Sequence, residues 1–409
     1  MSVKYRLIIM SFLQYAIWGA WLISLGAYLG GGLEFSGRQI GSFFATMGIA
    51  SLFMPAIMGI IADRWIPAQK LLGICHIIGA ALLVAAAPQT EYFPLYSLIL
   101  CSVMFYMPTI SLSNSVAYNA LSSAGLDTVK AFPPIRVWGT VGFICAMIAV
   151  DLLGFARTSM QLYTSAALAV ILGIYSFTLP NCPTCKVAKN QSWVDTMGLR
   201  AFALFKQKKM AVFFIFSMLL GVSLQITNAF ANDYLTNFFG SNEAYKGTFG
   251  VEHANILISI SQMSETLCIL LIPFFLKRFG IKNVMLISMF AWVLRFALLG
   301  TGNPGEGVWM LVLSMLVYGV AFDFFNISGS LYVDKETDPS IRSSAQGVFM
   351  IMTNGFGSFF GSYAAGEVVD RNGWPDSWFI FAGYALVVGL LFAVVFKYKH
   401  HPSEIKDKI

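Results

Sequence analysis

The sequence predicts an all-α polytopic membrane protein with twelve transmembrane helices in two six-helix bundles. Three observations predict this class. Hydrophobic residues make up 57% and charged residues only 11% of the 409 residues, which is more apolar surface than a soluble domain of this length can bury. The apolar residues form long runs, and the lysines and arginines fall mainly on alternate loops between these runs.

About twelve apolar runs follow one another, and about 20 apolar residues are enough to cross a hydrocarbon core about 30 Å thick. Their residues do not alternate between apolar and polar, which excludes a transmembrane β-barrel. The runs extend over Arg6–Leu29, Arg38–Ala62, Leu71–Ala87, Phe93–Ala117, Pro134–Leu153, Leu162–Leu179, Met210–Phe230, Ile256–Leu276, Val284–Leu299, Trp309–Tyr332, Ala345–Val368 and Ser377–Phe396.

Positive charge is distributed unevenly between the two sides of the predicted membrane protein. Twenty lysines and arginines lie on the side of the N-terminus, whereas Arg38, Arg157, Lys246 and Arg371 lie on the other side. Because cytoplasmic loops carry the excess of lysine and arginine, both termini are expected in the cytoplasm. The net charge of +6 therefore reflects topology and predicts no nucleic-acid partner. No cleavable signal is evident, which predicts an uncleaved first helix.

A polar segment separates the first six runs from the last six. We expect residues 1–180 to form the N-terminal six-helix bundle, residues 181–209 a cytoplasmic linker, and residues 210–409 the C-terminal six-helix bundle and cytoplasmic tail. Apolar residues recur at helical spacing in the linker, which predicts an amphipathic helix on the inner membrane surface, with a mobile loop as the alternative. They are Trp193, Val194, Met197, Ala201, Leu204 and Phe205.

Two carboxylates lie in the middle of apolar runs: Glu265 in Ile256–Leu276 and Asp323 in Trp309–Tyr332. An ionised acid at that depth costs about 2.5–3.5 kcal/mol on insertion scales. Acids that expensive usually line a water-accessible path, where they exchange a proton or bind a polar solute. The pair therefore predicts a transporter, with proton coupling as the leading mechanism.

Polar and aromatic side chains recur at helical spacing in several runs. Amides and carboxylates match the hydroxyls of a sugar, and a ring can stack on a planar group, so a nucleoside fits this inventory. The stripes are Arg136, Thr140 and Phe143 in the fifth run, Gln225 and Asn228 in the seventh, Gln262 and Glu265 in the eighth, and Tyr318, Phe322 and Asn326 in the tenth, with Asp323 one step round.

Each stripe also has a structural alternative. Amides in membrane spans often only link helices, and aromatic residues at helical spacing often only pack. Arg136 follows Pro133 and Pro134 and can extend its side chain to the membrane surface. His76 and Arg295 are interpreted as packing or helix-end residues. Asp323 can pair with a basic group instead of carrying a proton.

A short motif follows the second run. Gly59-x-x-x-Asp63-Arg64, with matching basic residues Lys277 and Arg278 after the eighth run, resembles the loop motif of the major facilitator superfamily. That resemblance implies that Asp63 and Arg64 form a conformational latch, and that two bundles rock about a central cavity. The second copy lacks the acid, so the latch is not symmetrical.

Five longer segments, in order along the chain, resemble the nucleoside:proton symporter family of that superfamily. They are Ser11–Trp21, Phe132–Thr140, Leu224–Asn228, Ser259–Thr266 and Ala321–Gly329. The resemblance implies a nucleoside site lined by Arg136, Thr140, Phe143, Gln225, Asn228, Gln262, Glu265, Tyr318 and Phe322. It also implies that Asp323 is important for transport, and that the protein is a multi-pass protein of the bacterial inner membrane.

The expected mechanism is import of nucleosides by proton symport with alternating access, in which Asp323 or Glu265 takes up the proton. The expected partners are nucleosides, protons and lipid, and the expected state is a monomer. The alternatives are a proton-coupled symporter for another polyhydroxyl solute such as a sugar, a xanthosine-selective permease, and an exporter of aromatic compounds.

The sequence predicts neither an enzyme nor a receptor. It has no H-E-x-x-H motif, no G-x-S-x-G motif, and no His/Asp cluster with metal spacing, and it has no sensing domain. Cys182 and Cys185 form one C-x-x-C in the linker, which alone is a weak zinc or redox signal. We therefore expect no metal and no cofactor.

Overall fold

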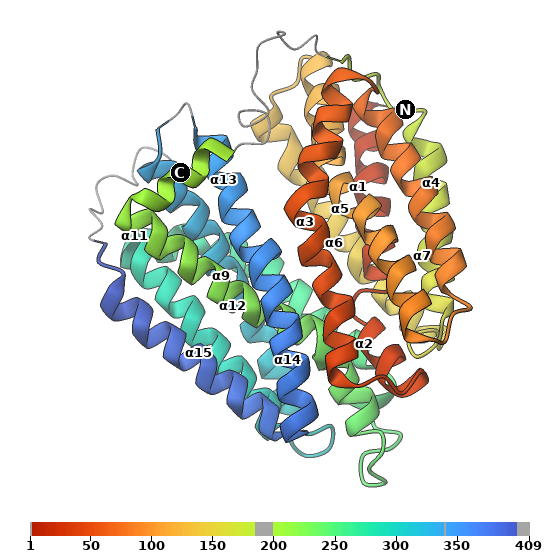
Figure 1. Ribbon diagram of the computed structural model, residues 1–409, viewed down its shortest axis with the longest axis vertical. Helices are drawn as coiled ribbons and strands as arrows, with labels where there is room; N and C mark the ends of the chain where they lie inside the picture. Colours follow the sequence, from red (N-terminus) through yellow and green to blue (C-terminus); the bar gives the residue numbers. More distant parts are fainter. Residues whose placement is uncertain (1, 185–198, 339–340, 399–409) are drawn as a thin grey trace. The chain divides into compact units, whose positions relative to one another are not determined.

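Helices are the only regular secondary structure in the residues that the computed structural model describes, which are 2–184, 199–338 and 341–398 (Figure 1). Contacts group the chain into two compact units. The first contains Met1–Phe35 and Ser42–Met197, and the second contains Ser36–Gly41 and Gly198–Ile409. Helix α3, Gly37–Arg64, therefore begins in the second unit and continues in the first. The predicted domain bounds stay a prediction.

The first unit contains the helices of the first six runs. They are α1 (Val3–Gly19), α2 (Leu25–Ala27), the π-helix η1 (Tyr28–Gly32), α3, α4 (Ala68–Ala86), α5 (Tyr92–Ser123), α6 (Thr128–Leu152) and α7 (Met160–Ser176). Helix α4 packs against α5 and α7, and α1 packs against α6. The last pair approaches closely at two glycines: a Cβ at Gly142 would meet the backbone of Phe12, and one at Gly19 the backbone of Phe143. Small residues allow this approach between membrane helices.

The second unit contains the remaining helices. They are the 3₁₀-helix η2 (Leu199–Lys206), α9 (Lys208–Asp233), the π-helix η3 (Tyr234–Phe238), α10 (Phe249–Glu252), α11 (Ala254–Thr301), α12 (Val308–Glu336), α13 (Arg342–Met350), the π-helix η4 (Ile351–Gly357), α14 (Ser358–Asn372) and α15 (Asp376–Val395). Helix α11 packs against α12 and α15. Gly319 on α12 lies against the backbone of Ser264 on α11, so a side chain there would separate the two helices.

Eight helices of the described residues are long and apolar enough to span a membrane. The difference from the twelve predicted runs has a local origin. Helix α11 contains the eighth and ninth runs and is broken at Gly280, whose φ of 75° is open to glycine and disfavoured for other residues. The first and sixth runs form the 17-residue helices α1 and α7, and the eleventh is divided among α13, η4 and α14.

The linker differs from its prediction in the part that the structure describes. Leu199–Lys206 is a 3₁₀-helix and not an amphipathic α-helix. Leu204 is buried, and the ring of Phe205 lies 5.2 Å from that of Phe214 on α9, so the apolar face of η2 packs on protein. Trp193, Val194 and Met197 lie outside the described residues.

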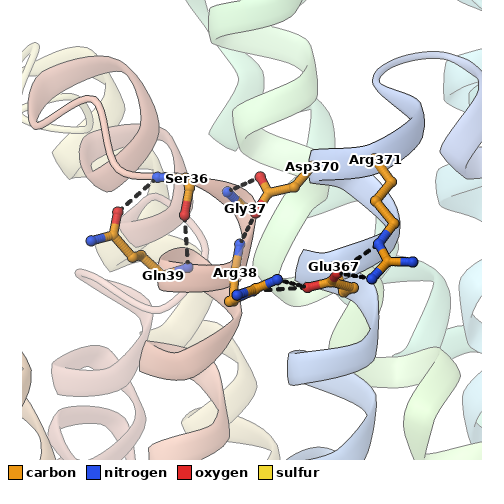
Figure 2. Close-up of polar contacts among 7 residues, drawn as sticks. All are labelled: Ser36, Gly37, Arg38, Gln39, Glu367, Asp370 and Arg371. Atoms are coloured by element: carbon orange, nitrogen blue, oxygen red, sulfur yellow. Dashed lines mark hydrogen bonds and ion pairs between the residues drawn. The ribbon is translucent and has the colours of Figure 1, made fainter.

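The start of α3 is held by a group of polar side chains within the second unit (Figure 2). The Asp370 carboxylate of α14 accepts hydrogen bonds from the backbone amides of Gly37, at 2.6 Å, and Arg38, at 2.8 Å. Glu367 lies between two guanidinium groups, 2.5 Å from that of Arg38 and 2.6 Å from that of Arg371. Acids at a helix N-terminus satisfy its free amides and oppose its dipole, so these residues fix where α3 begins.

Candidate functional site

The first unit presents its predicted site residues on one face of α6. Arg136 and Thr140 are half-buried and Phe143 is buried. The Arg136 guanidinium lies 3.8 Å from the centre of the Tyr15 ring on α1. A cation over a ring at this distance is held electrostatically and by stacking, so the side chain is directed to α1. The Phe143 ring meets Trp18 of α1 edge to face at 6.4 Å. Close packing of α1 on α6 therefore positions this stripe.

A buried hydrogen-bond network lies behind the aromatic residues of α1. The Gln14 amide donates to Thr109 at 2.7 Å, and its oxygen lies 2.8 Å from His76 Nε2. The Tyr106 hydroxyl donates to the Gln14 backbone carbonyl at 2.8 Å, and its ring lies 5.7 Å from that of Trp18. His76 is thus a buried residue within the helix packing, in agreement with its interpretation from the sequence as a packing residue.

The second unit gathers most of the predicted polar residues around Tyr318 of α12. The Tyr318 hydroxyl is hydrogen-bonded with the Gln262 side chain of α11. Its ring stacks on that of Phe322 one turn later, with centres 5.7 Å apart and planes 10° apart. Tyr318 is buried, whereas Gln262 and Phe322 are half-buried. The Gln262 amide, the Tyr318 phenol and the Phe322 ring therefore form one surface made by α11 and α12.

The two carboxylates belong to the same group. Glu265 and Asp323 are close enough to interact electrostatically with each other and with Tyr318. Asp323 is 4% exposed, and its Oδ2 has no hydrogen-bond partner among the described residues. Glu265, one turn after Gln262, is half-buried. Two neighbouring carboxylates in a poorly hydrated interior repel each other when both are ionised, so the pair favours holding a proton.

Helix α9 contributes the two predicted amides. Gln225 is 7% exposed with its Oε1 lacking a partner among the described residues, and Asn228 is half-buried. An amide oxygen left without a partner in a buried place is costly unless water or a ligand satisfies it. Other residues of α9 line a small cavity together with residues of α11, α12 and η4. It is lined by Leu220, Gly221, Leu224, Trp292, Phe322, Asn326, Thr353 and Asn354.

Arg295 is the residue that the sequence interpretation missed. Its side chain is neither at a helix end nor an ordinary packing group: it is 2% exposed in α11, and its guanidinium lies 4.7 Å from the centre of the Tyr318 ring. The signal was present, because a charged residue inside the apolar run Val284–Leu299 requires the same explanation as Glu265 and Asp323.

The latch of Asp63 and Arg64 stays a prediction. The side chain of Asp63 lies outside the description, and Arg64 at the end of α3 is exposed. Cys182 is a buried free thiol, and Cys185 lies outside the described residues. Within the described part of the chain, no three His, Cys, Asp or Glu side chains form a group that could hold a metal ion.

Comparisons with known proteins agree with this geometry. A family model described as the nucleoside H⁺ symporter matches residues 1–401. The chain is similar to nucleoside permease NupG of Escherichia coli (strain K12), with 53% identity over 98% of this chain and 97% of that protein. It is 49% identical to the xanthosine permease of the same organism, over 100% of this chain and 99% of that protein.

A solved structure supports the fold. The crystal structure of nucleoside transporter NupG superimposes with a TM-score of 0.91 at 53% identity, and the match covers 98% of this chain and 100% of that one. The predicted class is therefore confirmed: the protein is an all-α, multi-pass membrane protein with the major facilitator fold. The roles of the individual site residues stay predictions.

Proposed function

We propose, on the premise that this chain belongs to the nucleoside H⁺ symporter family, that the stripes on α6, α9, α11 and α12 bind its nucleoside and that Glu265 and Asp323 carry its coupled proton. The family membership itself makes the protein a proton-coupled importer of nucleosides. The observation that supports the residue assignment is the group around Tyr318, where two carboxylates, an amide and a stacked ring pair meet.

The proposed roles follow from the chemistry of each group. Gln225, Asn228 and Gln262 offer amide donors and acceptors, and Glu265 offers a carboxylate, which suits the hydroxyls of a ribose. The stacked rings of Tyr318 and Phe322, with Phe143 in the first unit, offer flat apolar faces for a nucleobase. Arg136 and Thr140 contribute donors from α6.

The proposed coupling uses the electrostatic cost of the acid pair. With both carboxylates ionised, the second unit carries adjacent negative charges in its interior; one proton relieves that repulsion. A proton moving through 100 mV releases about 2.3 kcal/mol, and 1.4 kcal/mol corresponds to a tenfold ratio. One proton per neutral nucleoside therefore supports roughly 40-fold accumulation per 100 mV. Uptake falls as the external proton supply falls.

The remaining parts of the proposal concern topology. The excess of lysine and arginine on one side supports cytoplasmic termini and insertion in the bacterial inner membrane. Asp63 and Arg64 are proposed as the latch at the cytoplasmic end of α3, by resemblance to the superfamily motif. The protein is proposed to act as a monomer.

The test is uptake of radiolabelled uridine into proteoliposomes with an imposed pH gradient and potential. We expect accumulation that collapses when an uncoupler dissipates both. Unlabelled adenosine and uridine should compete, whereas sucrose and maltose should not. Xanthosine competition in parallel reports base selectivity, which matters because the chain is similar to a xanthosine permease. Uptake that ignores both gradients would refute proton coupling, and competition by sugars alone would refute the nucleoside site.

A further inference from the structure

Arg295 lies in the second part of α11, after the break at Gly280, and its side chain is almost completely buried. No carboxylate among the described residues lies within ion-pair distance of it. A charged group in such a place is kept only where neighbouring groups satisfy it. The partners of its two terminal nitrogens are neutral and come from α11 and α12, whereas its Nε has no hydrogen-bond partner among the described residues.

The guanidinium is fixed by three kinds of contact. One terminal nitrogen donates to the Ser314 carbonyl at 2.6 Å and to the Ser261 hydroxyl at 3.4 Å. The other lies 3.9 Å from the sulfur of Met315. In return, the Ser314 hydroxyl donates to the backbone carbonyl of Arg295 at 3.1 Å. Two adjacent residues of α12 therefore hold the planar group at one place.

At that place the guanidinium covers a site residue. It lies 4.7 Å from the centre of the Tyr318 ring, and the Trp292 ring meets the same tyrosine edge to face at 6.0 Å. The Tyr318 ring also stacks on Phe322, and its hydroxyl is hydrogen-bonded with Gln262. Removing the guanidinium would leave an unfilled volume against the ring and free it to turn away from Phe322 and Gln262.

We propose that Arg295 is a positioning residue for nucleoside binding, which acts through Tyr318 by holding its ring against Phe322 and its hydroxyl at Gln262. This inference rests on the proposed assignment of Tyr318 and Phe322 to the nucleoside site. Lysine is not an equivalent group, because an ammonium cannot stack on the ring and bind the Ser314 carbonyl with a planar fork.

The test is a double-mutant cycle on uridine transport with Arg295→Gln, Tyr318→Leu and both together, measured as KM and maximal rate in proteoliposomes. We expect Arg295→Gln to raise KM roughly 10-fold, the scale of a desolvated cation–π contact, with a smaller change in maximal rate per folded transporter. In the Tyr318→Leu background the same substitution should change KM less than twofold, because its effect passes through the ring.

Two further variants separate positioning from folding. Arg295→Lys keeps the charge and should raise KM by an intermediate amount; it carries the test if Arg295→Gln does not fold. Lys282→Gln is the matched control, since Lys282 also lies after the break in α11 and its ammonium donates to the Ala393 carbonyl of α15 at 3.0 Å. It should leave KM unchanged.

The outcomes distinguish this inference from the site assignment. If Tyr318→Leu leaves uridine KM unchanged, the assignment of Tyr318 to the site is wrong. If Tyr318→Leu raises KM but Arg295→Gln and Arg295→Lys lower only the amount of folded protein, Arg295 is structural and the inference is overturned. Equal effects of Arg295→Gln in both backgrounds overturn it as well.

Discussion

Replacing Gly142 by alanine tests whether close packing of α1 on α6 sets the positions of Arg136, Thr140 and Phe143, the residues of the first unit that are proposed to bind the nucleoside. Gly142 lies on α6 between Thr140 and Phe143 and faces the backbone of Phe12 on α1. Gly19 on α1 makes the reciprocal close approach to the backbone of Phe143 on α6. The substitution keeps every proposed binding side chain, so a change in transport reports geometry.

The size of the displacement follows from the structure. An ideal Cβ at Gly142 would lie 2.8 Å from the Phe12 carbonyl carbon, and closer to its oxygen, whereas ordinary contact begins at 3.4 Å. The two backbones must therefore separate by at least 0.6 Å, and neither can yield as a flexible side chain does. Misplacement of a binding group by about 1 Å can reduce a rate by about 100-fold. We expect uridine transport to fall at least 10-fold.

The assay is uridine uptake per folded transporter, with folding followed by thermal melting of the purified protein. Gly383→Ala is the control, because a Cβ at this helical glycine meets nothing within 4 Å. Alanine should then stabilise the helix by about 1 kcal/mol without affecting transport. Normal KM and rate in Gly142→Ala would show that α1 and α6 need not approach this closely, and the packing argument would be wrong.

Three further predictions concern the acids, the start of α3 and the linker thiol. If both acids share the coupled proton, Asp323→Asn and Glu265→Gln should each abolish gradient-driven accumulation of uridine. Uridine exchange without a gradient should survive in Asp323→Asn. If either variant accumulates uridine like wild type, the substituted acid does not take part in the coupling. Ser36→Ala removes the hydroxyl that accepts a hydrogen bond from the Gln39 backbone amide at 3.3 Å, and it should lower the free energy of unfolding by about 1 kcal/mol, measured by thermal melting. Ser97→Ala is the serine control away from a helix start. An unchanged melting curve for Ser36→Ala would contradict the prediction. Burial raises the pKa of the Cys182 thiol. In a variant that keeps Cys182 as its only cysteine, maleimide should therefore label the native protein more slowly than the denatured protein, and labelling should accelerate as pH rises. If the native and denatured proteins are labelled at equal rates at every pH, the thiol is accessible and the prediction is wrong.

The stripes on α11 and α12 could be predicted from the sequence because residues three or four apart in a helix lie on the same face. Gln262 and Glu265 are three residues apart and lie on the same side of α11, and Tyr318 and Phe322 are four apart and stack. The cost of a charged group in lipid also identified Asp323, whose side chain is 4% exposed, and its place on a water-accessible path stays a prediction. These inferences need only local geometry and one energy scale.

Contacts between helices distant in sequence could not be predicted in the same way. Arg295 was interpreted as a helix-end or packing residue because nothing in its neighbourhood along the chain shows that Ser314 and Tyr318 of α12 receive it. The break in α11 likewise depends on a single glycine with positive φ, Gly280, which the sequence shows only as one of many glycines. Spacing predicts which residues share a face, and packing decides what that face meets.

The direction of the hydrogen bonds around His76 argues that proton coupling belongs to the second unit. The Thr109 hydroxyl donates to the Tyr106 carbonyl at 2.5 Å, so its oxygen accepts from the Gln14 amide nitrogen. The Gln14 oxygen is then left to accept, and the His76 nitrogen that faces it at 2.8 Å carries its hydrogen. His76 thereby donates from Nε2 to Gln14, and releasing that hydrogen would leave the Gln14 oxygen facing a lone pair. Asp323, by contrast, keeps an oxygen that no described group satisfies, beside a second carboxylate. A proton can arrive at such an oxygen without breaking an existing hydrogen bond, and this difference favours the proposed role of Asp323 in proton exchange.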